Sequence, residues 1–163
     1  MIVTVNTDAS FSKLYQRGTF AFWIVSDTGR LFGSGLLKNE CERPEIAEFQ
    51  CLINAVHRLI RARWSGITRI IINTDCKNVI HLVQRDRKEI RRYKLGPWGN
   101  DLLIKFENMV HQPYLNGIKI ECRHVRSHVS TKSKRQWVND WCDKEAKRHL
   151  HEFLQTQIIH HEP

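Results

Sequence analysis

Hydrophobic positions alternate in some segments of the chain and recur at helical spacing in others. Residues 2–8 alternate and are rich in β-branched side chains, which is typical of a half-buried strand. Alternation of this kind, or a short apolar run, predicts strands at residues 2–8, 20–25, 31–38, 69–73 and 118–125. Apolar positions three and four residues apart predict helices at residues 44–63, 76–84 and 98–112, and a last helix with apolar positions from Val138 to Leu154.

The order of these segments indicates the fold class. Asp27-Thr28-Gly29 is a turn signal, so the second and third strands are expected to form a hairpin. Residues 20–25 lack polar alternation, which indicates cover on both faces. An antiparallel meander followed by interleaved helices and strands predicts an α/β fold with a mixed sheet and helices on its faces. The length of 163 residues suits one domain, expected at 1–155, with a frayed tail at 156–163.

Composition excludes several classes of protein. Apolar residues make up 41% and charged residues 26%, which is ordinary for a globular chain. No apolar run approaches the roughly 20 residues of a membrane span, and the N-terminus has no visible secretion signal. Five scattered cysteines without a Cys-x-x-Cys pair fit a reduced chain. We therefore expect a cytoplasmic protein that is not bound to a membrane.

The formal net charge of +9 is concentrated in two segments. Residues 85–94 carry a net of +4 and residues 123–135 a net of +5, so the rest of the chain is neutral. A single charge run is often only a solvated face. Two uncompensated clusters indicate a surface that follows phosphates, so a nucleic acid is the expected partner.

Acidic residues fall where strands end and helices begin. Asp8 and Asp75 close two predicted strands, and they lie side by side if those strands are adjacent and parallel. Glu48 lies in the opening turns of a helix, and Asp140 and Asp143 lie on the last helix. Each alone is more often a turn, capping or solvated residue. Carboxylates brought close together repel one another and resist ionising together. A bound Mg²⁺ or Mn²⁺ removes this repulsion. In a basic protein, such a cluster favours two-metal phosphoryl transfer.

Five motifs together resemble type 1 ribonuclease H over nearly the whole chain. They are NTDAS (6–10), AEFQCLINAV (47–56), NTDCKNV (73–79), VRSH (125–128) and NDWCDKEA (139–146). The resemblance implies a ribonuclease H-like fold, with a five-stranded mixed sheet whose first three strands are antiparallel and with helices on both faces. It also implies an endonuclease that hydrolyses the RNA strand of RNA–DNA hybrids with two Mg²⁺ ions, which Mn²⁺ can replace.

The resemblance also assigns roles to single residues. The metal ligands, also catalytic, are expected to be Asp8, Glu48, Asp75 and Asp143, with Asp140 as the alternative to Asp143. His128 is the expected loop histidine, which moves protons or helps product leave. The family's basic protrusion falls on 85–96. Trp98 lies just beyond it and is expected either to stack on the substrate or to pack within the helix that follows. Expected substrate-binding residues are Ser10, Lys77, Arg85, Arg87, Lys88, Arg91, Arg92, Lys94, Arg126 and Lys132.

Some positions depart from the family pattern. Arg43, Pro44 and Glu45 replace asparagines that help the family read the hybrid, and Lys77 replaces a polar residue. Two alternatives therefore stay open: a nuclease of branched DNA or structured RNA, and a nucleic-acid-binding protein without catalysis. A monomeric, stand-alone bacterial or bacteriophage protein is expected. The histidines of the C-terminal region lack a tight ligand spacing, so a hydrophilic tail is favoured over a transition-metal site for His149, His151, His160 and His161.

Overall fold

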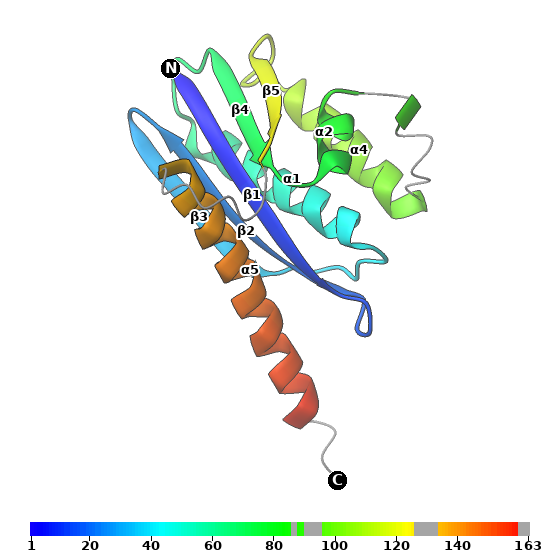
Figure 1. The fold of residues 1–163 in the computed structure, drawn as a ribbon. Helices are drawn as coiled ribbons and strands as arrows, with labels where there is room; N and C mark the ends of the chain where they lie inside the picture. The colour runs from blue at the N-terminus through cyan, green and yellow to red at the C-terminus, as the bar shows by residue number, and fades with distance from the viewer. Residues whose placement is uncertain (86–87, 90–95, 126–133, 160–163) are drawn as a thin grey trace.

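The computed structural model describes the chain apart from residues 86–87, 90–95, 126–133 and 160–163. Its centre is a five-stranded sheet in the order β3-β2-β1-β4-β5 (Figure 1). The strands are β1 Ile2–Ser12, β2 Arg17–Ser26, β3 Gly29–Leu36, β4 Arg69–Thr74 and β5 Lys119–His124. β1, β2 and β3 pair antiparallel, whereas β4 pairs parallel with both β1 and β5. The mixed sheet predicted from the sequence is confirmed.

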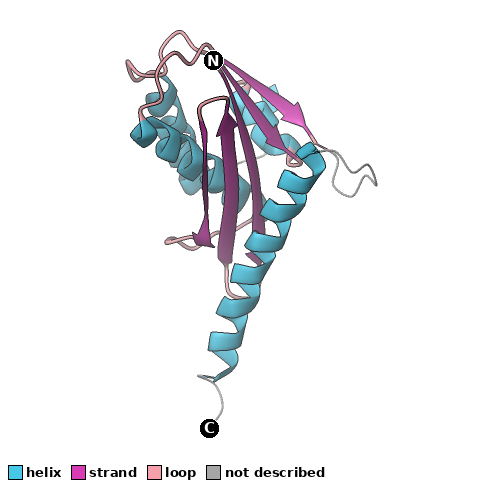
Figure 2. Ribbon diagram, turned by 90° about the vertical axis from the view of Figure 1, so that its left-hand side faces the viewer, coloured by secondary structure: helices cyan, strands magenta, loops and turns pink. Residues whose placement is uncertain are grey.

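Helices cover both faces of this sheet (Figure 2). The described helices are α1 Pro44–Ala62, α2 Lys77–Val83, α4 Gly96–Val110 and α5 Lys134–Ile159. α1, α2 and α4 lie on one face, and α5 runs diagonally across the other. The predicted order of strands and helices is therefore confirmed. No described helix is long and apolar enough to cross a membrane.

The main core lies between α1 and the sheet. Pro44 occupies the first turn of α1, where its missing N–H costs nothing, and Arg63 ends the helix in the left-handed conformation. Side chains at helical spacing, such as Phe49, Leu52 and Leu59, are fully buried against the sheet. The burial of this face holds α1 in one register.

α5 approaches the opposite face through small side chains. Ala21 of β2 packs against Cys142 and Ala146, and each of the three is at most 1% exposed. Because these side chains are small, the helix backbone lies close to the strand. The alternation along β2 therefore sends Phe22 and Ile24 toward α1, and Ala21 and Trp23 toward α5. The expectation that residues 20–25 are covered on both faces is confirmed.

The ends of two elements differ from the sequence prediction. β1 continues to Ser12 because residues 7–12 extend the antiparallel pairing with β2 down to Arg17. α5 continues to Ile159, into the segment that we expected to form a tail, and its C-terminal half extends beyond the sheet (Figure 1). Phe153 on this half contacts the Tyr15 ring edge-on, with the ring centroids 5.8 Å apart. This contact holds the extension against the β1–β2 turn.

Candidate active site

Two copies of the triplet Asn-Thr-Asp bring carboxylates together at the sheet. Residues 6–8 end the parallel pairing of β1 and residues 73–75 end that of β4, with Asn6 opposite Asn73. Asp8 and Asp75 therefore follow at the same end of neighbouring strands, as the sequence predicted. One oxygen each of Asp8, Glu48 and Asp75 lies within 4.8 Å of the other two. We call these three residues the carboxylate cluster.

Glu48 reaches the cluster from α1, which lies on the face of the sheet opposite α5. Among the described strands, β4 pairs with β1 only as far as Asn6, so the next stretch of β1 has an open edge there. The Ala9 N–H at this edge donates to Glu48 Oε1 at 3.2 Å and to Asp8 Oδ1 at 2.9 Å. Glu48 Oε2 is buried and has no hydrogen-bond partner among the described residues. A buried carboxylate oxygen without a partner is costly unless it meets a cation or a proton.

Burial and mutual repulsion shift the ionisation of the cluster. Burial, then the charges of Asp75 and Asp143, raise the pKa of Asp8 from 3.8 to about 7. Burial, then the charges of Asp8 and Asp75, raise the pKa of Glu48 well above its ordinary value. The Ala9 N–H opposes both shifts, more weakly. A site built this way favours the binding of positive charge.

Asp143 of α5 acts on this cluster through its charge and is itself paired with a basic side chain, Lys147. It is the α5 carboxylate whose charge raises the pKa of Asp8, while Lys147 one turn later lowers that pKa. Lys147 Nζ lies 2.8 Å from Asp143 Oδ2. Asp140, the alternative fourth ligand, is exposed and accepts a hydrogen bond from Gln136 at 2.9 Å. Asp143 is thus the α5 carboxylate whose charge acts on Asp8, whereas the three-residue cluster itself is formed without it.

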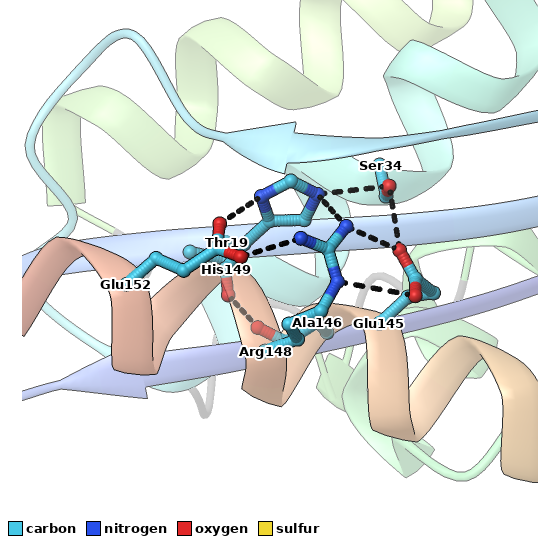
Figure 3. A network of polar contacts seen from close by, with 7 residues as sticks. All are labelled: Thr19, Ser34, Glu145, Ala146, Arg148, His149 and Glu152. Atoms are coloured by element: carbon cyan, nitrogen blue, oxygen red, sulfur yellow. Dashed lines mark hydrogen bonds and ion pairs between the residues drawn. The ribbon is translucent and has the colours of Figure 1, made fainter.

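A polar network fixes α5 on the sheet and so places Asp143 (Figure 3). Thr19 Oγ1 donates to the Ala146 carbonyl at 2.6 Å. Ser34 Oγ donates to Glu145 at 3.2 Å and lies 3.0 Å from His149 Nε2. Glu145 is also paired with Arg148 at 2.8 Å, so each turn of this part of α5 is tied to β2, β3 or its own helix. His149 therefore helps to hold α5 against β3.

The donor set fits a hard divalent cation. Its ligands are carboxylate oxygens, which Mg²⁺ and Mn²⁺ prefer, and its electrostatics favour added positive charge. The unpartnered Glu48 Oε2 points to the same conclusion, because a bound cation would satisfy it. Asp8, Glu48 and Asp75 are the residues placed to hold such an ion, with Asp143 beside them.

The predicted substrate-binding residues are placed in different regions. Ser10 lies on β1 two residues after Asp8, and the exposed Lys77 begins α2 two residues after Asp75. Arg85 lies instead by the end of α4, with Nη2 3.5 Å from His111 Nε2. Lys88 is exposed. The predicted residues outside the described part of the chain are Arg87, Arg91, Arg92, Lys94, Arg126, His128 and Lys132, together with His160 and His161.

Trp98 is 52% exposed at the start of α4. It lines a hollow of about 420 Å³ together with Lys38 and Lys105, and Leu102 lies on the same helix. The residue is therefore about half open to solvent, and it also borders this hollow.

Sequence reasoning missed three contributors to the site. Lys147 was detectable, because a basic residue four positions after an acid on a helix forms an ion pair. His124 Nε2 lies 3.1 Å from the Asp75 carbonyl, a contact that no sequence pattern announces. Asn6 and Asn73 form a buried amide pair beneath the cluster, which the repeated Asn-Thr-Asp triplet could have indicated.

Comparison with known proteins identifies the family. The family model described as reverse transcriptase-like matches residues 6–112. No curated protein matches the chain. Among solved structures, the N-terminal RNase H domain of a Mycobacterium tuberculosis protein has a TM-score of 0.70 at 14% identity, covering 96% of this chain and 98% of that one.

Two further structures have the same fold. RNase H1 from the halophilic archaeon Halobacterium salinarum has a TM-score of 0.62 at 16% identity, covering 93% of this chain and 99% of that one. LC11-RNase H1 in complex with an RNA/DNA hybrid has a TM-score of 0.64 at 14% identity, covering 91% and 99%. The resemblance found in the motifs is confirmed: the chain belongs to the reverse transcriptase-like family and has the fold of ribonuclease H.

Proposed function

We propose that this protein is a metal-dependent endonuclease that hydrolyses the RNA strand of RNA–DNA hybrids. The observation that carries the proposal is the carboxylate cluster, with its unpartnered buried oxygen, set on a ribonuclease H fold. The complex of LC11-RNase H1 with an RNA/DNA hybrid supports the choice of substrate. A pure phosphate-binding protein gains nothing from acids that repel one another at this position, which argues against the silent alternative.

Asp8, Glu48, Asp75 and Asp143 would hold two divalent cations. Mg²⁺, or Mn²⁺ in its place, supplies the Lewis acid that makes water a nucleophile and stabilises a leaving 3′ oxygen. Asp8 and Asp75 lie side by side and would both supply carboxylate oxygens to the metal site. Glu48 would orient the attacking water. Through the 2′-OH next to the scissile phosphate, it would also help to distinguish RNA from DNA. The Ala9 N–H holds Glu48 and Asp8 in fixed positions for this task.

Other residues of the chain handle charge around the reaction. Lys147 keeps a cation beside Asp143 when no metal is bound, which limits repulsion within the cluster. His128, the predicted loop histidine, would move a proton or assist product release. The basic segments 85–94 and 123–135 would hold the complementary strand through its phosphates, without reading its sequence.

One observation favours a different substrate on the same chemistry. Arg43, Pro44 and Glu45 precede Glu48 at the start of α1, where the family's hybrid-reading asparagines are expected. The metal-binding acids are thus kept while part of the substrate-reading set is replaced. Branched DNA or structured RNA is therefore the second candidate substrate.

A cleavage panel tests the proposal. The purified chain is incubated with Mg²⁺ and a labelled RNA–DNA hybrid, double-stranded RNA, each single strand and a DNA junction. We expect cutting of the RNA in the hybrid, and its loss in Asp75→Asn. Asp140→Asn is the matched control, because it removes an exposed acid from α5 outside the cluster. Preferential cutting of the junction or of double-stranded RNA would instead establish the second candidate.

A further inference from the structure

A hollow of about 420 Å³ lies beside the carboxylate cluster, on the α5 face of the sheet. Its floor is formed by Thr4, Asn6 and Asn73, and Trp23 and Trp137 contribute to its walls. This volume falls within the range of small-molecule sites, which begins at roughly 300 Å³. Asp8 and Asp75 follow two residues after Asn6 and Asn73 on the same strands, about 7 Å away along the sheet.

One of the residues that line the floor of the hollow carries a buried hydrogen-bond acceptor without a partner among the described residues. The Trp23 carbonyl can only accept, so Asn6 must turn its Nδ2 toward it, at 3.2 Å. Asn6 Oδ1 therefore accepts from Asn73 Nδ2, at 2.9 Å. This leaves Asn73 Oδ1 free, and it has no hydrogen-bond partner among the described residues although Asn73 is only 2% exposed. The order of donors along the pair fixes the free group as an acceptor, so the hollow suits a ligand with an N–H or O–H donor.

The walls of the hollow are apolar and aromatic. Trp23 stacks on Phe32, with ring centroids 5.4 Å apart, and Trp137 meets Trp23 edge-on at 5.5 Å. Trp137 is 58% exposed, so more than half of this residue is open to solvent. Val25 and Val138 complete the lining. Aromatic walls around one buried acceptor favour a flat ring with an N–H on its edge over an aliphatic or a charged ligand.

We propose that this hollow binds a nucleobase. The ring would lie against Trp137 and Trp23, and an N–H on its edge would donate to Asn73 Oδ1. The choice of a nucleobase over other heterocycles rests on the proposed function, whereas the hollow and its free acceptor do not. The base has two possible sources with the same chemistry: a free mononucleotide, or an unpaired nucleotide of a bound strand next to the cluster.

Binding is tested without divalent cations, so that no cleavage occurs. The full chain in EDTA is titrated with uridine 5′-monophosphate, ribose 5-phosphate and a short single-stranded oligouridine, followed by tryptophan fluorescence and by calorimetry. Uracil has a single N–H donor, at N3, so 3-methyluridine 5′-monophosphate and the 3-methylated oligomer remove that hydrogen bond and leave the protein unchanged. We expect each methylated ligand to bind about tenfold or more weakly than its parent, since the buried acceptor stays unpaired.

Variants locate the site. Trp137→Ala should weaken binding of uridine 5′-monophosphate or the oligomer by about 5- to 100-fold, the range expected for losing one stacking surface. Ile158→Ala removes another exposed apolar side chain of α5, one that does not line the hollow, and should leave binding unchanged. Ribose 5-phosphate should not compete. Binding of the mononucleotide supports the first source, and binding of the oligomer alone supports the second.

Three results would overturn the inference: no binding of either uridine ligand, equal binding of the methylated ligands, or no effect of Trp137→Ala. Each is independent of the proposed function. A protein that cuts the hybrid in Mg²⁺ but binds no base in EDTA loses only this inference. A protein that binds the base but cuts nothing in the panel loses only the proposed function.

Discussion

Replacing Asp8 with asparagine should stabilise the metal-free protein at alkaline pH. The asparagine keeps an Oδ1 that accepts from the Ala9 N–H, so the local hydrogen bond survives while the charge disappears. The pKa of Asp8 is raised from 3.8 to about 7 by burial and by its acidic neighbours. Below about pH 4 the carboxyl is neutral in both folded and unfolded chains. As the pH rises toward 7 the unfolded chain ionises first, so the folded protein loses stability.

The size of this effect follows from the pKa. A shift of about three pKa units at about 1.4 kcal/mol each sets an upper limit of about 4 kcal/mol. Because Asp8 shares its repulsion with Glu48 and is half-buried, we expect about 2 to 4 kcal/mol at about pH 8 and almost none at about pH 4. For a chain of this length, that corresponds to a rise in Tm of about 5 to 15 °C.

Thermal and urea unfolding in EDTA at the two pH values measure this difference, with Asp140→Asn as the matched control. Adding Mg²⁺ should then stabilise the wild-type chain, by about 2.7 kcal/mol at a hundredfold excess over Kd, and stabilise Asp8→Asn much less. If Asp8→Asn were destabilising at both pH values, or were stabilised by Mg²⁺ as strongly as the wild type, the electrostatic reasoning would be refuted.

Three further predictions follow from the structure and the charge pattern. Lys147→Ala removes the cation bound to Asp143, so Mg²⁺ affinity measured by calorimetry should rise, by at most about fivefold because the ion pair is partly exposed; a weaker affinity would contradict this. Ala146→Leu overfills the contact of α5 with Ala21 and should destabilise the chain by about 1 to 3 kcal/mol in urea, whereas Lys144→Leu on the exposed side should not. Neutralising Arg91 and Arg92 should weaken hybrid binding and reduce the dependence of log Kd on log salt by about two; an unchanged slope would mean that this run only faces solvent.

The parts of the fold with strong hydrophobic periodicity were predictable from the sequence. The Phe49–Leu59 face of α1 and the alternation of β1 gave the correct elements, and the Asn-Thr-Asp triplets placed Asp8 beside Asp75. The end of α5, residues 155–159, was not predicted, because the apolar pattern fades after Leu154. The nearby ring contact of Phe153 is with a residue distant in sequence, Tyr15.

The electrostatic detail of the site also depends on tertiary structure. Glu48 reaches the cluster only because the parallel pairing of β4 stops at Asn73 and leaves the Ala9 N–H free to hold it. The free acceptor of Asn73 depends in turn on the carbonyl of Trp23, which a third strand supplies. Such contacts join residues far apart in sequence and leave no local pattern.

The central claim is that the carboxylate cluster carries out metal-dependent hydrolysis of RNA in a hybrid. The most direct measurement compares the wild-type chain with Asp75→Asn on one labelled RNA–DNA hybrid, recording cleavage with Mg²⁺ and binding in EDTA. We expect the wild type to cut the RNA strand only when Mg²⁺ is present. We also expect Asp75→Asn to bind the hybrid with similar affinity and to cut at least about a thousandfold more slowly, since transition-state charge stabilisation of this kind is worth several kcal/mol. Substantial Mg²⁺-dependent cleavage by Asp75→Asn would contradict it.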